Sequence, residues 1–183
     1  PAQHQQLCFG RRMNFPFHKS LRCAIRGIVR CLKNERNMRF HTMAALYVLF
    51  FSGFFRLSRA ELAVLFVTIG AVLSAEVFNT AAEDLCDYVS PGFARRIGSV
   101  KDLAAGAVLL SALAAVGVGI VLFWRPERFA VILSWFLDAP WRLALLLVSL
   151  PAAAAFVVLP GRGDKPEKPG LDGKSSENSG TEK

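Results

Sequence analysis

The stretch LAVLFVTIGAVLSAEVFNTAAEDLCD, residues 62–87, joins an apolar segment directly to a polar stripe. Residues 62–75 carry no charged side chain and are typical of a membrane-spanning helix. Glu76, Asn79, Glu83 and Asp87 follow at offsets of 3, 7 and 11 residues, which places all four on about one face of the same helix. A carboxylate at the centre of a membrane helix costs about 2.5–3.5 kcal/mol on insertion scales. The stripe is therefore expected to bind a cation or to perform chemistry.

The composition agrees with a small membrane protein that spans the bilayer several times. Of the 183 residues, 53% are hydrophobic, which is high for an ordinary soluble domain. Residues 1–41 hold nine Lys or Arg and one acid, and this difference of +8 equals the net charge of the whole chain. The positive-inside rule predicts that this end is cytoplasmic. Beside membrane segments a basic N-terminus favours anionic lipid over nucleic acid, so no nucleic-acid partner is expected.

The N-terminal half predicts one interfacial helix and one span. Apolar residues recur at helical spacing across residues 21–32, with Arg and Lys on the other faces, as in an amphipathic helix that lies in the membrane interface. Residues 42–55 are uncharged and form the core of a first span. Arg39 and Arg56 lie near its two ends, and their long side chains can extend to the water boundary.

Two further spans are predicted on either side of a basic loop. The second span runs from Glu61 to about Tyr88 and is ended by Ser90-Pro91-Gly92. The loop that follows reaches Lys101 and contains two arginines, so it is expected to be cytoplasmic. Leu103–Trp124 supplies 22 uncharged residues as the third span.

The C-terminal part predicts an additional apolar segment. Residues 129–137 form a short apolar piece, and residues 143–159 a fourth span kinked near Pro151. The fold class is therefore an all-α integral membrane protein. Its predicted parts are an N-terminal extension (1–16), of which 1–12 are not assigned to the native chain, a membrane domain (17–124), the additional hydrophobic segment with the fourth span (125–160) and a disordered charged tail (161–183).

Three polar blocks, residues 34–41, 76–87 and 101–108, converge at the cytoplasmic membrane boundary in this topology. Clustered carboxylates there suit Mg²⁺, which prefers oxygen ligands and often bridges substrate phosphates. A carboxylate that does not bind the metal can act as a general base on a lipid hydroxyl. Lys101 can neutralise phosphate charge, with Asp102 as its anchor. From the residues alone, a cation or phosphate site, a proton-coupled transporter and a structural salt-bridge layer all remain open.

The same blocks resemble a known family. Glu35-Arg36-Asn37-Met38-Arg39-Phe40-His41, then Glu76-x-x-Asn79-Thr80-Ala81-x-Glu83-x-x-x-Asp87, then Lys101-Asp102-x-Ala104-Ala105-Gly106-Ala107-Val108 are similar to the prokaryotic diacylglycerol kinase family. The resemblance covers roughly residues 17–123. The Glu-Arg-Asn-x-Arg-x-His form and the Ala-Ala-Gly after Lys-Asp resemble the undecaprenol kinase branch more than the branch that acts on diacylglycerol.

The resemblance implies a homotrimer with an interfacial helix and three spans per subunit, in the bacterial inner membrane with its active sites facing the cytoplasm. It implies transfer of the γ-phosphate of ATP, with Mg²⁺, to a lipid hydroxyl, either undecaprenol or diacylglycerol. Sites in the family form between subunits. The roles carried over by motif position are Glu76 as general base, Asn79 as the residue that orients the reacting groups, Glu35 and Glu83 as ligands of the metal–nucleotide complex, and Asp87, Lys101 and Asp102 on the nucleotide side.

Other residues and segments receive a different expectation. His41 is expected to pack or to form a hydrogen bond, and Asp84, which is off the stripe, to face solvent or a basic neighbour. The fourth span and the tail lie outside the family pattern. The alternatives from other classes are a small proton-coupled transporter that uses Glu76, and a membrane scaffold in which the C-terminal part carries the function.

Overall fold

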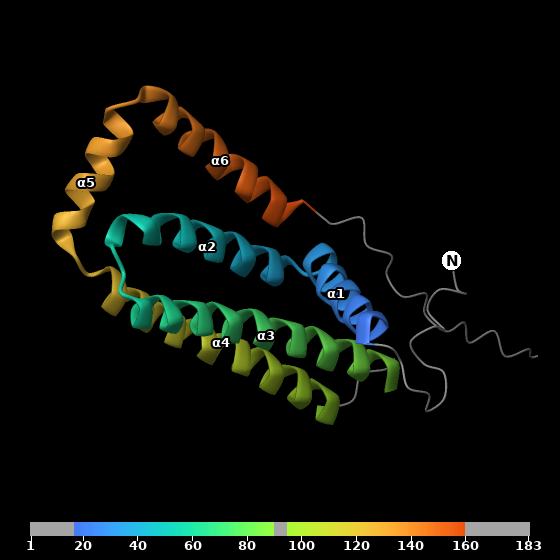
Figure 1. The fold of residues 1–183 in the computed structure, drawn as a ribbon. Coiled ribbons are helices and arrows are strands. Elements are labelled where there is room, and N and C mark those ends of the chain that lie inside the picture. The colour runs from blue at the N-terminus through green and yellow to red at the C-terminus, as the bar shows by residue number, and fades with distance from the viewer. Residues whose placement is uncertain (1–16, 90–94, 160–183) are drawn as a thin grey trace, which may run out of the picture.

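The computed structural model describes residues 17–89 and 95–159, and every regular element within them is a helix (Figure 1). Four of these helices are long and apolar enough to cross a membrane. The predicted all-α fold with a fourth span is confirmed; the predicted turn at residues 90–92 and the two tails lie outside the described residues. The helices are α1 (Phe17–Asn34), α2 (Arg36–Ser52), η3 (Gly53–Phe55), α3 (Arg59–Val89), α4 (Arg95–Phe123), α5 (Pro126–Leu137) and α6 (Pro140–Val158).

Helix α1 has the character of an interfacial helix. Its apolar residues Leu21, Ile25 and Ile28 stay exposed, and Cys31 alone is buried. The helix lies across the ends of α2 and α3 and does not continue the bundle (Figure 1). An exposed apolar stripe opposite a basic face fits the boundary between headgroups and acyl chains.

A tight turn reverses the chain between α2 and α3. Arg56 adopts the left-handed conformation (φ 48°), the one non-glycine residue with positive φ in the described part of the chain. Ser58 and Glu61 then cap α3 reciprocally, because the Ser58 N–H donates to Glu61 (2.7 Å) and the Glu61 N–H donates to the Ser58 hydroxyl (3.3 Å). This capping box fixes where α3 begins and which of its faces meets α2.

Helices α3 and α4 form the most extensive packing in the described chain (Figure 1). Leu65 and Val72 of α3 are buried, as are Val108 and Leu122 of α4. Helix α4 begins at Arg95, so the prediction that the basic loop extends to Lys101 was wrong. No proline interrupts residues 95–101, and one glycine costs a helix only about 1 kcal/mol, so the helix starts before the apolar segment does.

The additional segment forms a helical hairpin, α5 and α6. Pro126 and Pro140 begin the two helices, in the first turn where a missing N–H has no cost. Helix α6 continues through Pro151 and returns along α2 to the end of the molecule where α1 lies (Figure 1). None of its residues is buried, so within one chain it is covered on one side only.

Candidate active site

The polar stripe of α3 starts at a buried acid. Glu76 is 1% exposed, the most buried large side chain among the described residues, and Asn79 one turn later is 8% exposed. The Asn79 amide donates to Oε1 of Glu83 at 2.9 Å. The predicted face therefore exists for these three residues. Its end at Glu76 is dry, while its end at Glu83 is more accessible.

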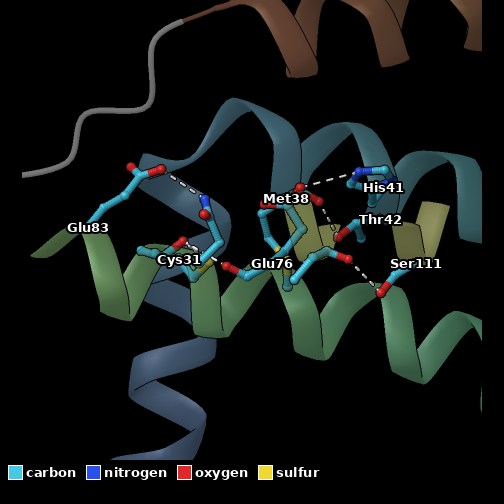
Figure 2. Close-up of polar contacts among 10 residues, drawn as sticks. Cys31, Met38, His41, Thr42, Glu76, Glu83 and Ser111 are labelled. Carbon is cyan, nitrogen blue, oxygen red and sulfur yellow. Dashed lines mark hydrogen bonds and ion pairs between the residues drawn. The ribbon is translucent and has the colours of Figure 1, made fainter. Parts of the chain in front are cut away.

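His41 of α2 faces Glu76 across the helix interface. Its Nε2 lies 3.3 Å from Oε1 of Glu76, and the two side chains point toward one another in Figure 2. No hydrogen bond of good geometry reaches that carboxylate oxygen from the described residues. Glu76 thus has an imidazole, but no lysine or arginine, within ion-pair distance in the described structure. The expectation that His41 packs or forms a hydrogen bond did not identify this neighbour.

Glu35 lies at the junction of α1 and α2, at the N-cap position of α2, where its side chain forms no capping hydrogen bond. Burial raises the pKa of the Glu35 carboxyl, and the negative charges of Glu83 and Asp84 raise it further, while Arg39 lowers it. Glu35 therefore lies within electrostatic range of the outer end of the α3 stripe. Two of the blocks singled out in the sequence come together here.

Cys31 and Thr80 join α1 to α3 beside this cluster. Sγ of Cys31 lies 3.2 Å from Oγ1 of Thr80, whose hydroxyl donates to the Glu76 carbonyl at 3.0 Å. Because the threonine proton is used there, the thiol is left to donate. Burial raises the pKa of Cys31, and the charges of Glu35, Glu76 and Asp84 raise it further, so the thiol stays protonated at neutral pH. The interfacial helix is thereby fixed against the stripe.

The third block contributes one ion pair. Lys101 of α4 binds Asp87 of α3, and not Asp102, which is exposed on α4 and has no polar partner among the described residues. The prediction that Asp102 anchors Lys101 was wrong, because consecutive helix residues point about 100° apart whereas Asp87 reaches across from the packed neighbour. Asp84 pairs with Arg30 at 3.3 Å on the surface, which confirms that it faces a basic neighbour.

The residues of this site lie within a region that is similar to known proteins. The profile of the prokaryotic diacylglycerol kinase family matches residues 22–123, which is more than half of the chain and contains all three blocks. The chain belongs to this family. It is similar to the undecaprenol kinase of Bacillus subtilis (36% identity over 107 residues, 58% of this chain and 87% of that protein). It is also similar to a diacylglycerol kinase of Synechocystis (37% over 108 residues, 58% of this chain and 62% of that protein).

Membership of a family of prokaryotic diacylglycerol kinases makes the protein a multi-pass membrane lipid kinase, with a nucleotide as co-substrate. Neither relative is a transporter, and nothing in the comparisons supports that alternative. The matched region ends at residue 123, so α5 and α6 lie beyond it. Little of the Bacillus protein is left unmatched, too little for a hairpin of this size.

The carboxylate cluster of this lipid kinase fits a magnesium–nucleotide complex. Oδ1 of Asn79 is buried without a partner, and like charge around Glu35 raises the pKa of that carboxyl; a cation would relieve both. Within residues 17–89 and 95–159, no three His, Cys, Asp or Glu side chains lie close enough to form a metal cage. Mg²⁺ is often held by only one or two carboxylates together with phosphates and waters.

Arg39 is the residue of the lipid kinase that sequence reasoning misplaced. It was expected to extend toward water, but it is 5% exposed, and its Nη1 donates to the Leu159 carbonyl at 2.8 Å. That carbonyl lies at the C-terminal end of α6, where the helix dipole is negative and favours a cation. No local signal in the sequence marks this contact, because Arg39 stands in a polar block and its partner lies 120 residues away.

Proposed function

We propose that the protein transfers the γ-phosphate of ATP to the hydroxyl of undecaprenol, with Glu76 as the general base. The observation that carries the proposal is a carboxylate 1% exposed, beside an imidazole and without a basic ion-pair partner in the described structure. A carboxylate neutralised by lysine or arginine would be a weak base. Glu76 is instead free to accept a proton, and its burial suits a site that meets a lipid.

The reaction is a direct displacement at the γ-phosphorus. The lipid oxygen forms a bond to phosphorus as the bond to the oxygen of ADP breaks, and the hydroxyl proton passes to the Glu76 carboxylate. His41 holds that carboxylate in place through the contact between Nε2 and Oε1. Asn79 orients the reacting groups and is itself oriented by Glu83. Catalysis then rests mainly on positioning and on stabilising charge, as is usual for phosphoryl transfer.

The nucleotide side of the site is assigned to the more accessible end of the stripe. Glu35 and Glu83 would hold Mg²⁺, which when bound neutralises charge on the nucleotide phosphates. Lys101, oriented by Asp87, engages the phosphates, and the exposed Asp102 contributes beside it. ATP reaches this end from the cytoplasm, which the basic N-terminal segment marks as the inner side of the bacterial membrane.

The preference for undecaprenol rests on the Glu-Arg-Asn-x-Arg-x-His form of residues 35–41 and on the similarity to the Bacillus enzyme of that name. The similarity to a diacylglycerol kinase is of the same size, so that lipid is the competing acceptor. We further propose a homotrimer with active sites shared between subunits. Many large apolar side chains of α4 and α6 are exposed in a single chain, which leaves room for both lipid and neighbouring subunits.

The test is phosphate transfer from γ-labelled ATP by purified protein in mixed micelles, with undecaprenol and diacylglycerol offered in parallel. We expect labelled undecaprenyl phosphate, dependent on Mg²⁺, and a smaller yield of phosphatidic acid. Preferential labelling of diacylglycerol would overturn the substrate assignment and keep the reaction. A folded protein that labels neither lipid would overturn both. The mass of the complex in detergent tests the trimer separately.

A further inference from the structure

A cavity of about 500 Å³ lies between α2, α5 and α6, toward the end of the molecule opposite the carboxylates. Its volume falls within the roughly 300–1,000 Å³ that small-molecule sites occupy. Two of its three walls belong to the hairpin beyond the family match, and the third is the C-terminal half of α2. The hairpin folds back along α2 on the side away from α3 and α4 (Figure 1).

The walls of the cavity suit a hydrocarbon chain. Leu46 and Phe50 of α2 face Leu145 and Leu146 of α6 across it. The one pair of hydroxyls in the α2 and α6 walls is already satisfied, because Tyr47 donates to Ser149 at 2.9 Å and Ser149 donates to the Leu146 carbonyl at 2.8 Å. Apart from Arg142, these walls therefore offer contact area and no unmet side-chain hydrogen-bond donor or acceptor to a ligand.

A fixed positive charge stands at the border of the cavity. The guanidinium carbon of Arg142 lies 4.3 Å from the ring centre of Trp135 and 5.4 Å from that of Trp141. Its Nη1 donates to the Trp135 carbonyl at 2.9 Å, while Nε is buried without a hydrogen-bond partner. No carboxylate of the described chain lies within ion-pair distance of Arg142, although Asp138 is only one turn earlier in sequence.

The position of Arg142 in its helix adds to this charge. It lies in the first turn of α6, where the helix dipole is positive and favours an anion over a cation. The N-cap residue is Ala139, whose side chain offers no acceptor, but Pro140 has no N–H and the Arg142 N–H donates to the Ala139 carbonyl at 2.9 Å. The contribution of this helix start to an anion site is therefore mainly its dipole. The Arg142 guanidinium and the positive end of the helix dipole together form an anion-binding element, and tryptophans such as Trp135 and Trp141 are typical of headgroup depth.

We propose that this cavity binds an anionic phospholipid, with one acyl chain between α2 and α6 and its phosphate against Arg142 at the start of α6. The charge selects the headgroup, and the apolar walls hold the chain. The site lies on the membrane face opposite the carboxylates, so its occupant is a resident lipid and not the substrate. The proposal goes beyond the lipid kinase activity and holds whichever lipid alcohol is phosphorylated.

The test is native mass spectrometry of the full-length protein released from detergent, with phosphatidylglycerol and phosphatidylcholine of matched chains added in equal amounts. We expect retention of phosphatidylglycerol over phosphatidylcholine by about tenfold, the value of one charge-assisted contact. Arg142→Gln should abolish that preference. Arg59→Gln, which removes an exposed charge at the same end of the molecule, should leave it unchanged.

A second variant tests binding of the acyl chain separately from binding of the headgroup. Leu146→Trp fills the cavity and should lower retention of both lipids at least fivefold, since bulk in a wall competes with the acyl chain. Equal retention of the two lipids by the wild type, or an unchanged preference in Arg142→Gln, would overturn the proposal. So would a Leu146→Trp variant that retains both lipids but changes the subunit number, because a second copy of the chain would then be the occupant.

Discussion

The two ends of the helical bundle differ in how their acidic side chains are paired. At the carboxylate end, formed by Glu35, Glu76 and Glu83, acids lie close together and the most buried one has no lysine or arginine partner within the described residues. At the aromatic end, Arg125 pairs with Glu61 and donates to the Phe55 carbonyl at 2.7 Å.

Aromatic rings pack around Phe55, whose carbonyl accepts from Arg125. Phe55 packs against Phe123 (4.8 Å between ring centres) and Phe129 (5.8 Å), both edge to face. Paired charge under aromatic cover stabilises a fold, whereas clustered like charge costs stability and persists for another reason. The contrast teaches that chemistry belongs to the end where like charges cluster, and four predictions test it.

The largest effect is expected from Glu76→Gln. The amide keeps the shape of the side chain and removes the base, so turnover should fall by about 10²–10⁴-fold in the labelled-ATP assay. Asp84→Asn is the matched control, because it removes an acid from the same helix at an exposed ion pair and should stay within about twofold. Turnover of Glu76→Gln near that of the control would mean that the buried acid is structural.

Glu83→Gln is expected to act on the nucleotide and less on the lipid. It removes a proposed ligand of Mg²⁺ while an amide oxygen still accepts from Asn79. The concentration of Mg²⁺–ATP that gives half-maximal rate should rise by about 10–100-fold, with a smaller change in the half-saturating lipid concentration. Titrating each substrate at saturation of the other measures the two effects, and equal changes in both would contradict the assignment.

Arg125→Gln tests the aromatic end. It breaks the pair with Glu61 and the contact with the Phe55 carbonyl, so the melting temperature should fall below that of the wild type. Turnover per folded molecule should not change. Thermal unfolding in detergent measures the first quantity, with Arg59→Gln as an exposed control. A large loss of turnover with unchanged stability would contradict the assignment of catalysis to the carboxylate end and of stability to the aromatic end.

The smallest effect concerns Glu35 and pH. Because burial and neighbouring acids raise its pKa, the folded protein holds a proton there more tightly than the unfolded chain does. This stabilisation is present at acidic pH and is lost as pH rises through the raised pKa. In metal-free protein, the melting temperature of the wild type relative to Glu35→Gln should therefore decrease as pH rises from mildly acidic to neutral. Parallel profiles would show that Glu35 is not under like-charge strain.

Much of the molecule could be predicted from sequence because its signals are local. The interfacial helix, the four spans and the alignment of Glu76, Asn79 and Glu83 depend on periodicity within single helices. The partners of these residues do not. His41 against Glu76, and Lys101 against Asp87 instead of Asp102, depend on how each helix is rotated about its axis, which is set by packing and caps such as that of Ser58 and Glu61.

The start of α4 illustrates a second limit. Arg95 belongs to the helix although the apolar pattern begins later, because hydropathy marks the membrane-embedded part of a helix and not its full length. The short apolar piece and the fourth span were predicted from their apolar character, but neither their pairing as the hairpin α5–α6 nor the contact with Arg39 has a local signal.

The bond from Arg39 to Leu159 also has a consequence for synthesis. Its two residues are 120 positions apart, so at about 5–20 residues per second the donor is made on the order of ten seconds before its acceptor. Throughout that interval α2, α3 and α4 are synthesised, while the Arg39 guanidinium lacks the acceptor that it has in the finished protein. The C-terminal end of α6 is thus needed to complete the hydrogen bonding of α2. A chain that terminates before Leu159 would lack α6 residues and would also leave Arg39 without this acceptor.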